Sequence, residues 1–230
     1  MSLPVAILAG GLATRLRPIT AKIPKALVSV AGKPFLAQQL NLLHEQGIHE
    51  VVVCIGHLGE MVQAAIPDGT PWGMKLRYVF DGPQLLGTGG ALRQALPYLG
   101  AAFFVLYGDS YLPTNYQAIA ASFANSGKAG LMTVYRNEGR WDTSNVVYRN
   151  RQIIAYDKRQ RLSDMRYIDY GLGVLTPGAF AGLEQAVPLD LTVIYQQLIV
   201  TGELAGYEVQ ERFFEIGSPA GLAELEDLLA

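Results

Sequence analysis

The sequence predicts an α/β protein with a doubly wound, mostly parallel (Rossmann-like) sheet and an antiparallel section, in a single domain with two lobes. Strand-length apolar runs alternate with helical patterns up to about residue 135. These runs are continuously apolar, as in parallel strands buried on both faces. Later strand patterns follow one another across polar turns. We expect a first lobe at 1–135, an antiparallel section at 136–176 and closing helices at 177–230.

Each expected element has a local signal. Proline opens and glycine closes the first helical pattern. The strand patterns are apolar runs bounded by turn residues. The predicted strands are 5–9, 51–55, 75–80, 103–107, 130–135, 145–148, 152–156, 167–175 and 213–216. The predicted helices are 35–46, 60–66, 90–96, 115–125, 177–185, 191–200 and 220–229.

Composition limits the class of protein. The chain has 230 residues, is half hydrophobic and carries a net charge of −2, which favours one globular domain and disfavours a nucleic-acid partner. The single cysteine, Cys54, lies in an apolar run and is expected to be a small buried hydrophobe, so no internal disulfide forms. The sequence shows no signal peptide and no bilayer-spanning apolar run. We expect a cytoplasmic protein without a membrane partner.

A glycine turn follows the first predicted strand. It begins with Gly10-Gly11, and five basic residues precede the first acidic residue, Glu45: Arg15, Arg17, Lys22, Lys25 and Lys33. Glycine lets backbone N–H groups approach an anion closely, and the local positive charge favours a phosphate. The dinucleotide fingerprint and the Walker pattern are both absent. The alternative is a structural turn with solvated charges.

Two further segments lie at the ends of predicted elements. Asp109 follows a buried strand and Gly108, where a carboxylate is well placed to hold Mg²⁺ or, alternatively, to cap a turn. The turn 86–90 is glycine-rich and opens a helix, so its backbone is a candidate contact for a base or ribose, or simply a helix start.

The second half carries polar residues with structural alternatives. Without a ligand role, Lys158 would be a solvated side chain, Asp169 a turn residue and Ser218 the N-cap of a helix. Glu215 stands between apolar residues and therefore needs a partner or a metal. There is no Cys/His cluster for zinc and no sign of a nucleophilic triad.

Together these residues resemble the sugar-1-phosphate nucleotidyltransferase family. Gly10 through Lys25 matches the family signature G-G-x-G-T-R-L-x-P-x-T followed by P-K, with Ala13 in place of a glycine. The resemblance spans nearly the whole chain. It continues through Pro34 and the segments 86–91, 107–109, 156–158 and 215–219.

The resemblance implies roles for individual residues. Arg15, Lys25 and Asp109 would be catalytic, with Arg15 and Lys25 holding the triphosphate and Asp109 and Glu215 binding Mg²⁺. Asp157 stands where the family often has a sugar-binding Glu, and Asp169 where it often has Asn. The sugar phosphate would meet Asp157, Lys158, Asp169 and Gly171. The nucleotide would meet Leu8, Ala9, Gly10, Gly11, Thr14, Arg15, Lys25, Asp81, Gly87, Thr88 and Gly108.

The implied reaction is nucleotidyl transfer from a nucleoside triphosphate to a sugar 1-phosphate, with release of pyrophosphate. Segments 141–146 and 167–171 look closest to heptose-1-phosphate and mannose-1-phosphate guanylyltransferases. A carboxylate at Asp81 would accept the two adjacent donors of guanine, which favours GTP. Alternatively, Asp81 is only the turn residue before Gly82-Pro83.

Other functions remain open at this point. One is uridylyl or thymidylyl transfer, and another is nucleotide binding without turnover. A dinucleotide-dependent oxidoreductase is disfavoured by the missing fingerprint. Homo-oligomer formation is also left open.

Overall fold

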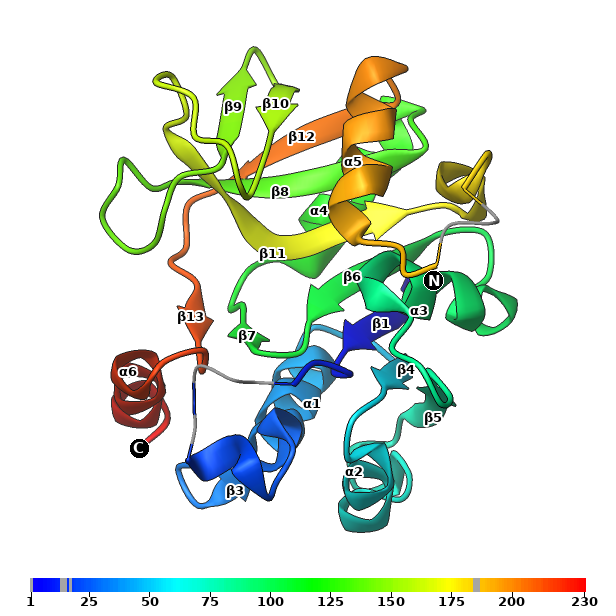
Figure 1. Ribbon diagram of the computed structural model, residues 1–230, viewed down its shortest axis with the longest axis vertical. Coiled ribbons are helices and arrows are strands. Elements are labelled where there is room, and N and C mark those ends of the chain that lie inside the picture. The colour runs from blue at the N-terminus through cyan, green and yellow to red at the C-terminus, as the bar shows by residue number, and fades with distance from the viewer. Residues whose placement is uncertain (1, 13–15, 17, 184–186) are drawn as a thin grey trace.

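Figure 1 shows a computed structural model of the chain, which describes residues 2–12, 16, 18–183 and 187–230. Its centre is a nine-stranded sheet. In spatial order the strands are β5 (Lys75–Phe80), β4 (Glu50–Ile55), β1 (Val5–Leu8), β6 (Phe103–Tyr107), β11 (Tyr167–Leu175), β8 (Gly130–Arg136), β12 (Leu204–Val209), β10 (Gln152–Tyr156) and β9 (Val146–Arg149).

The sheet is mixed, and its two halves differ in strand direction. Strands β5, β4, β1 and β6 are mutually parallel. Strand β11 is antiparallel to both β6 and β8, and β12 is again parallel to β8. The expected parallel order therefore holds for the first half only. Strand β11 lies inside the sheet, between β6 and β8. Its antiparallel pairing with β8 needs no crossover helix, and none lies between the two strands.

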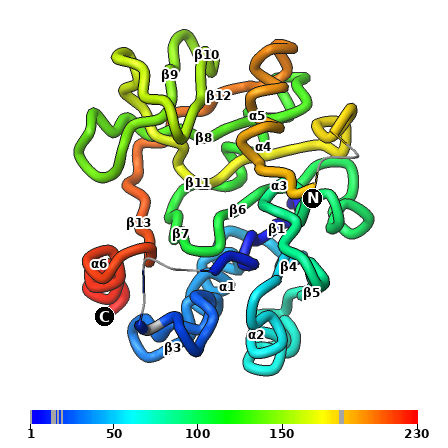
Figure 2. Tube along the Cα trace, in the orientation of Figure 1, coloured from blue at the N-terminus to red at the C-terminus, as the bar shows by residue number. Residues whose placement is uncertain are grey.

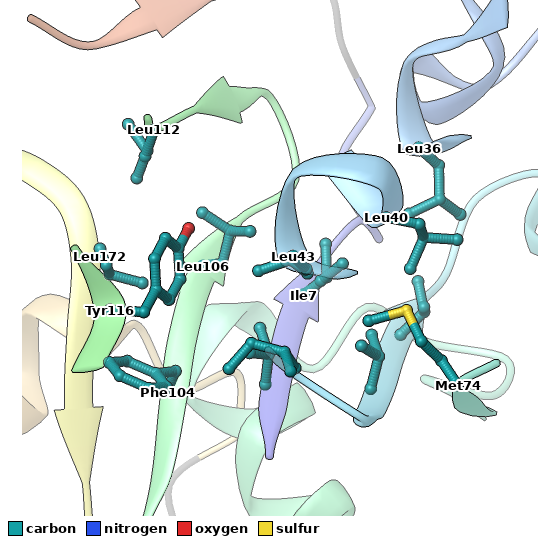
Figure 3. Close-up of a cluster of buried hydrophobic side chains, with 14 of the residues drawn as sticks. Ile7, Leu36, Leu40, Leu43, Met74, Phe104, Leu106, Leu112, Tyr116 and Leu172 are labelled. Atoms are coloured by element: carbon teal, nitrogen blue, oxygen red, sulfur yellow. The ribbon is translucent and has the colours of Figure 1, made fainter. Parts of the chain in front are cut away.

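Helices cover both faces of the sheet (Figures 1 and 2). Alternate residues of β1 show this, since Val5 and Ile7 pack into one core and Ala6 into the other. The first core includes residues of α1 (Phe35–Glu45), α2 (Gly59–Ala65) and α4 (Tyr116–Ser126), and the second includes residues of α3 (Gly87–Ala95) and α5 (Leu191–Val200). Figure 3 shows part of the first core, with Leu36, Leu40, Leu43, Ile7, Phe104 and Tyr116.

A third apolar cluster brings the end of the chain to its beginning. Helix α6 (Pro219–Leu229) packs through Leu225 against Phe35 and against Val30 of β2 (Ser29–Val30). Strand β2 pairs with β3 (Lys33–Pro34), and β13 (Phe214–Glu215) pairs with β7 (Ser110–Tyr111). The sequence did not predict β2, β3 or β7. Their pairing places the chain terminus beside the loop that follows β6.

Two further segments differ from the sequence prediction. The helix expected at 177–185 is instead a 3-10 turn, Pro177–Phe180, and Gly182 has a φ of +78° that a right-handed helix does not continue through. Strand β12 was not predicted. Shorter 3-10 turns lie at Ile19–Ala21, Lys25–Leu27, Thr70–Trp72 and Leu96–Tyr98. Within the described ranges, no helix is long and apolar enough to cross a bilayer.

Candidate functional site

A pocket lies where the parallel strands β5, β4, β1 and β6 end. Ligands of open α/β sheets gather at this edge, because the loops after the strands converge there. The cavity has a volume of about 280 Å³. It is lined by Leu8, Ala9, Gly10, Gly11, Lys25, Ala26, Cys54, Asp81, Leu85, Gly87, Thr88, Ala91, Tyr107, Gly108 and Asp109.

Glycines bring the backbone of two loops together at the pocket floor. A Cβ on Gly108 would clash with the Leu8 carbonyl oxygen, and one on Gly10 would lie 3.2 Å from the N of Gly56. The N–H groups of Ala9 and Gly108 already donate, to Cys54 O at 2.8 Å and to Leu8 O at 3.0 Å. Those of Gly10 and Gly11 donate to no backbone carbonyl within the described residues, so these are the donors that a phosphate can meet.

Lys25 and Asp109 face each other at the pocket wall. Lys25 Nζ lies 3.0 Å from Asp109 Oδ2, and their side chains are only 15% and 28% exposed. Lys25 begins the turn Lys25–Leu27, and Asp109 lies between β6 and β7. The pair thus places a cation and a carboxylate at the pocket wall. A phosphate bound there would compete with Asp109 for Lys25.

A buried glutamine that sequence reasoning missed holds the Asp109 loop. Gln39, on α1, is 1% exposed, and its Nε2 donates to Tyr107 O at 3.2 Å and to Ser110 O at 2.9 Å. These carbonyls flank Gly108 and Asp109. Its place in the apolar stripe of a predicted helix could have identified Gln39 from the sequence, because a buried amide needs hydrogen-bond partners.

The pairing of β13 with β7 places Glu215 beside the same loop. Glu215 lies opposite Ser110, and Ile216 N donates to Asp109 O at 2.9 Å. Two carboxylates suffice for Mg²⁺, which keeps several waters and binds substrate phosphates as well. No group of three or more His, Cys, Asp or Glu suited to a metal occurs in the described part of the chain. Asp109 and Glu215 have the oxygen donors that Mg²⁺ prefers, on segments that pair through their backbones.

The second glycine-rich turn is largely occupied by contacts within the protein. Gly89 N and Gly90 N both donate to Leu189 O, at 2.8 and 3.1 Å, and Leu191 N donates to Thr88 Oγ1 at 2.8 Å. The N–H groups of Gly89 and Gly90 are therefore engaged within the protein, as expected of the helix-start alternative. Gly87 and Thr88 still line the pocket.

Asp81 is both a turn residue and a residue of the pocket wall. It follows β5 in the pocket wall, and its Oδ2 accepts the Leu86 N–H at 3.2 Å, as expected of a turn residue. Its Oδ1 accepts no hydrogen bond among the described residues. Burial raises the pKa of the Asp81 carboxyl, while the Leu86 hydrogen bond opposes this shift. The turn therefore presents a partly desolvated carboxylate to the pocket.

The two acidic residues expected to meet the sugar are bonded within the protein. Asp157 Oδ1 accepts the N–H groups of Gln160 and Arg159 at 2.9 and 2.7 Å, which lowers the pKa of its carboxyl. Asp169 Oδ2 accepts the hydroxyls of Tyr156 and Tyr107, at 2.8 and 3.3 Å. Asp157 Oδ1 and the Asp169 carboxylate are thus engaged within the protein, and Lys158 Nζ contacts Tyr107 of the pocket wall.

The comparisons with known proteins agree with this geometry. Residues 5–144 match the sequence profile of the family described as Nucleotidyl transferase. The chain belongs to this family. The family predicted from the motifs is confirmed.

Relatives that resemble this chain are named for different substrates or processes. The low-salt glycan biosynthesis nucleotidyltransferase Agl11 of Haloferax volcanii is 30% identical, over 97% of this chain and 65% of that protein. The D-glycero-alpha-D-manno-heptose 1-phosphate guanylyltransferase of Campylobacter jejuni is 30% identical, over 76% of each chain. The N-acetylmuramate alpha-1-phosphate uridylyltransferase of Neisseria meningitidis is 27% identical, over 96% of each.

The fold agrees with that of a solved structure. HddC from Yersinia pseudotuberculosis, in complex with GMP-PN, superposes with a TM-score of 0.82 over 99% of this chain and 100% of that one, at 21% identity. The chain spans less than two thirds of the length of some curated relatives, including Agl11 at 65%.

Most of the predicted nucleotide residues come together in one pocket. All of those within the described residues line it, whereas Thr14 and Arg15 lie outside the described residues. The sequence placed Tyr107 in a segment of the family resemblance without giving it a function, and it did not single out Gln39; both contact distant parts of the chain.

Proposed function

We propose that this nucleotidyltransferase moves a nucleotidyl group from a nucleoside triphosphate to a sugar 1-phosphate and releases pyrophosphate. The observation that carries the proposal is the Lys25–Asp109 pair, 3.0 Å apart, in a pocket floored by glycine backbone. A cation, backbone donors and a carboxylate for a metal are the groups that phosphoryl chemistry requires.

The chemistry is an in-line displacement. An oxygen of the sugar 1-phosphate attacks the α-phosphorus, and the bond to pyrophosphate breaks on the opposite side. The protein needs no nucleophile of its own, so positioning and cations carry the catalysis. Gly10 and Gly11 would donate to the phosphates, and Lys25, with Arg15, would stabilise the charge that develops on the leaving group.

We propose Asp109 and Glu215 as the residues that hold Mg²⁺. The backbone bond between Ile216 and Asp109 and the β7–β13 pairing support this assignment. When bound, the ion would supply positive charge to the phosphate oxygens. Lys25, which pairs with Asp109 in this structure, would donate to the phosphates in the complex.

We propose GTP as the favoured nucleotide and a heptose or mannose 1-phosphate as the favoured acceptor. The Asp81 carboxylate lies in the pocket wall with Oδ1 available, and carboxylate oxygens can accept the ring N–H and amino group of guanine. The guanylyltransferase from Campylobacter jejuni supports this choice. Transfer from UTP is the competing specificity, favoured by the relative that aligns over 96% of both chains.

The test is a matrix assay of pyrophosphate release. GTP, ATP, UTP and dTTP are each combined with heptose, mannose, glucose and N-acetylmuramic acid 1-phosphates in the presence of Mg²⁺, with Asp109→Asn as the blank. The proposal expects the highest kcat/KM with GTP and a manno-configured acceptor. A maximum with UTP or dTTP would overturn the base assignment, and no release from any pair would overturn the activity.

A further inference from the structure

Lys158 is held by a tyrosine that belongs to the pocket wall. Its Nζ donates to the Tyr107 hydroxyl at 2.9 Å and lies 4.6 Å from the centre of the Tyr107 ring. It is also 5.8 Å from the centre of the Tyr156 ring. Tyr107 ends β6, two residues before Asp109, and lines the cavity. The ammonium of an otherwise exposed lysine is thereby fixed beside the pocket.

The Tyr107 hydroxyl is itself fixed by Asp169. A phenol has one hydrogen to donate, and Tyr107 gives it to Asp169 Oδ2, which leaves its oxygen to accept from Lys158. Tyr156 donates to the same carboxylate oxygen at 2.8 Å. Burial, and next the Asp169 charge, hold the pKa of both phenols well above their usual value. Both hydroxyls therefore remain donors at neutral pH.

The backbone around Asp169 fixes its carboxylate. Gly171 N donates to Asp169 Oδ1 at 3.0 Å, and Asp169 N donates to Asn145 Oδ1 at 2.9 Å. The register between β11 and β8 shifts between Asp169 and Gly173, and Gly171 has a φ of +94°. A Cβ at Gly171 would lie 3.3 Å from Tyr107 Cδ2. The glycine thus permits both the bulge and the close approach of Tyr107.

We propose that Tyr107 and Asp169 are positioning residues, which act through a chain of hydrogen bonds to hold the Lys158 ammonium where the phosphate of the acceptor binds. This inference rests on the proposed function. It also changes the role of Asp169, which orients a lysine rather than contacting the sugar. The acceptor's phosphate is then recognised by Lys158 in a fixed position, whatever sugar it carries.

The bonds of Asp169 favour this role over sugar contact. Its Oδ2 accepts two phenol hydroxyls and its Oδ1 accepts one backbone N–H. A sugar hydroxyl would have to displace or share these partners, at the cost of leaving a buried donor unpaired. Loss of the Tyr107 hydroxyl, in contrast, would free the lysine to sample many rotamers, and its ordering would then oppose acceptor binding.

The first arm of the test is kinetic. Tyr107→Phe removes only the hydroxyl and is expected to raise the KM for the sugar 1-phosphate about tenfold, while the KM for the nucleotide changes less than about twofold. Tyr156→Phe, which leaves the Tyr107 link intact, is expected to show a smaller effect. Tyr148→Phe is the matched control, because its ring packs on Tyr167, and it should behave as wild type.

Asp169→Asn separates positioning from sugar contact. Positioning predicts that the KM rises by a similar factor for every sugar 1-phosphate. A changed order of preference among the sugars would show that Asp169 contacts the sugar, which overturns the proposal. Equal increases in the KM of both substrates for Tyr107→Phe would indicate general structural damage and would also overturn it.

The second arm does not depend on turnover. The side-chain nitrogen NMR signal of Lys158, assigned by its loss in Lys158→Arg, should shift in Tyr107→Phe and in Asp169→Asn but not in Tyr148→Phe. An unchanged signal would overturn the proposal even if the enzyme is active. If wild-type protein transfers no nucleotide, the proposed function fails, and this signal still decides whether Tyr107 holds Lys158.

Discussion

The two halves of the sheet use their polar residues differently. In the parallel half, Lys25, Asp81 and Asp109 turn side chains into a pocket built from glycine backbone. In the half that contains β11, Asp157 and Asp169 are bonded to the protein itself. Asp169 shows that the side chain at a motif position can be held by several bonds within the protein, whereas the side chains of Lys25 and Asp109 bond only to each other among the described residues and lie in the pocket wall. We propose that the pocket of the parallel half binds the nucleotide and that the other half presents Lys158 to the acceptor.

Loss of the metal should have the largest effect, because it removes the only divalent charge proposed for the nucleotide side. We expect activity to disappear in excess chelator and to return with added Mg²⁺. Asp109→Asn should be inactive at any Mg²⁺ concentration, and Glu215→Gln should raise the Mg²⁺ concentration needed for half-maximal rate. Pyrophosphate release measures all three. Full activity in excess chelator would show that the reaction needs no metal ion.

Lys25→Ala should lower kcat by about 10²-fold or more, because it removes a cation that faces the developing charge. The same is expected of Arg15→Ala. Steady-state kinetics and circular dichroism together measure turnover and folding. The control is Lys75→Ala, because Lys75 pairs with Glu50 on the surface and should leave turnover unchanged. A near-normal kcat in Lys25→Ala would show that Lys25 does not stabilise the phosphates.

Asp81→Asn tests the assignment of the base. The amide replaces one acceptor oxygen by a donor, so guanine loses a hydrogen bond and meets an unfavourable donor pair. We expect the kcat/KM for GTP relative to UTP to fall about tenfold to 100-fold. Competition between the two nucleotides in one reaction measures this ratio directly. An unchanged ratio with lower stability would leave Asp81 with its turn role alone.

Gln39→Leu should disturb the Asp109 loop without touching the pocket. It leaves Tyr107 O and Ser110 O without their donor, and we expect kcat to fall about tenfold and stability by about 1–3 kcal/mol. Gln38→Leu is the matched control, because Gln38 is buried on the same helix but donates to Val30 O. Equal kcat losses in both variants would show that Gln39 has no special link to the site.

Modification of Cys54 by a thiol reagent should be the smallest of these effects. It lines the pocket, yet it is 1% exposed, and burial raises the pKa of its thiol to about 12. The thiolate fraction at pH 8 is then about 10⁻⁴, so a thiol reagent should not modify the folded protein within hours. Mass spectrometry measures the modification, with urea-unfolded protein as the positive control. Rapid labelling of folded protein would show that the pocket opens further than this structure implies.

The sequence predicted much of the fold but not its non-local parts. The bounds of β5, β6, β10 and β11 agree with the expected ranges, because each has the apolar or alternating pattern of a strand. Strand β12 was missed because Gly206 and Glu208 interrupt its apolar pattern, and it is stabilised by pairing with β8. The position of β11 inside the sheet also depends on pairing that no local pattern encodes.

In the site, too, local features could be predicted and long-range contacts could not. The glycine turn, Lys25 and Asp109 could be predicted, because closely spaced glycines and charges after a strand have a local chemical meaning. Gln39 and Tyr107 could not, since their partners lie 71 and 62 residues away in sequence. Asp169 was identified as a candidate but given the role of a sugar contact. Only its hydrogen bonds show which partners it has.

A crystal structure with Mg²⁺, a non-hydrolysable GTP analogue and a sugar 1-phosphate tests the contrast between the two halves most directly. We predict phosphates on the Gly10 and Gly11 N–H groups, Lys25 Nζ moved from Asp109 to a phosphate oxygen, and Asp169 still bonded to Tyr107 and Tyr156. A triphosphate bound outside the glycine pocket, or a sugar hydroxyl on Asp169 in place of the tyrosines, would contradict the account.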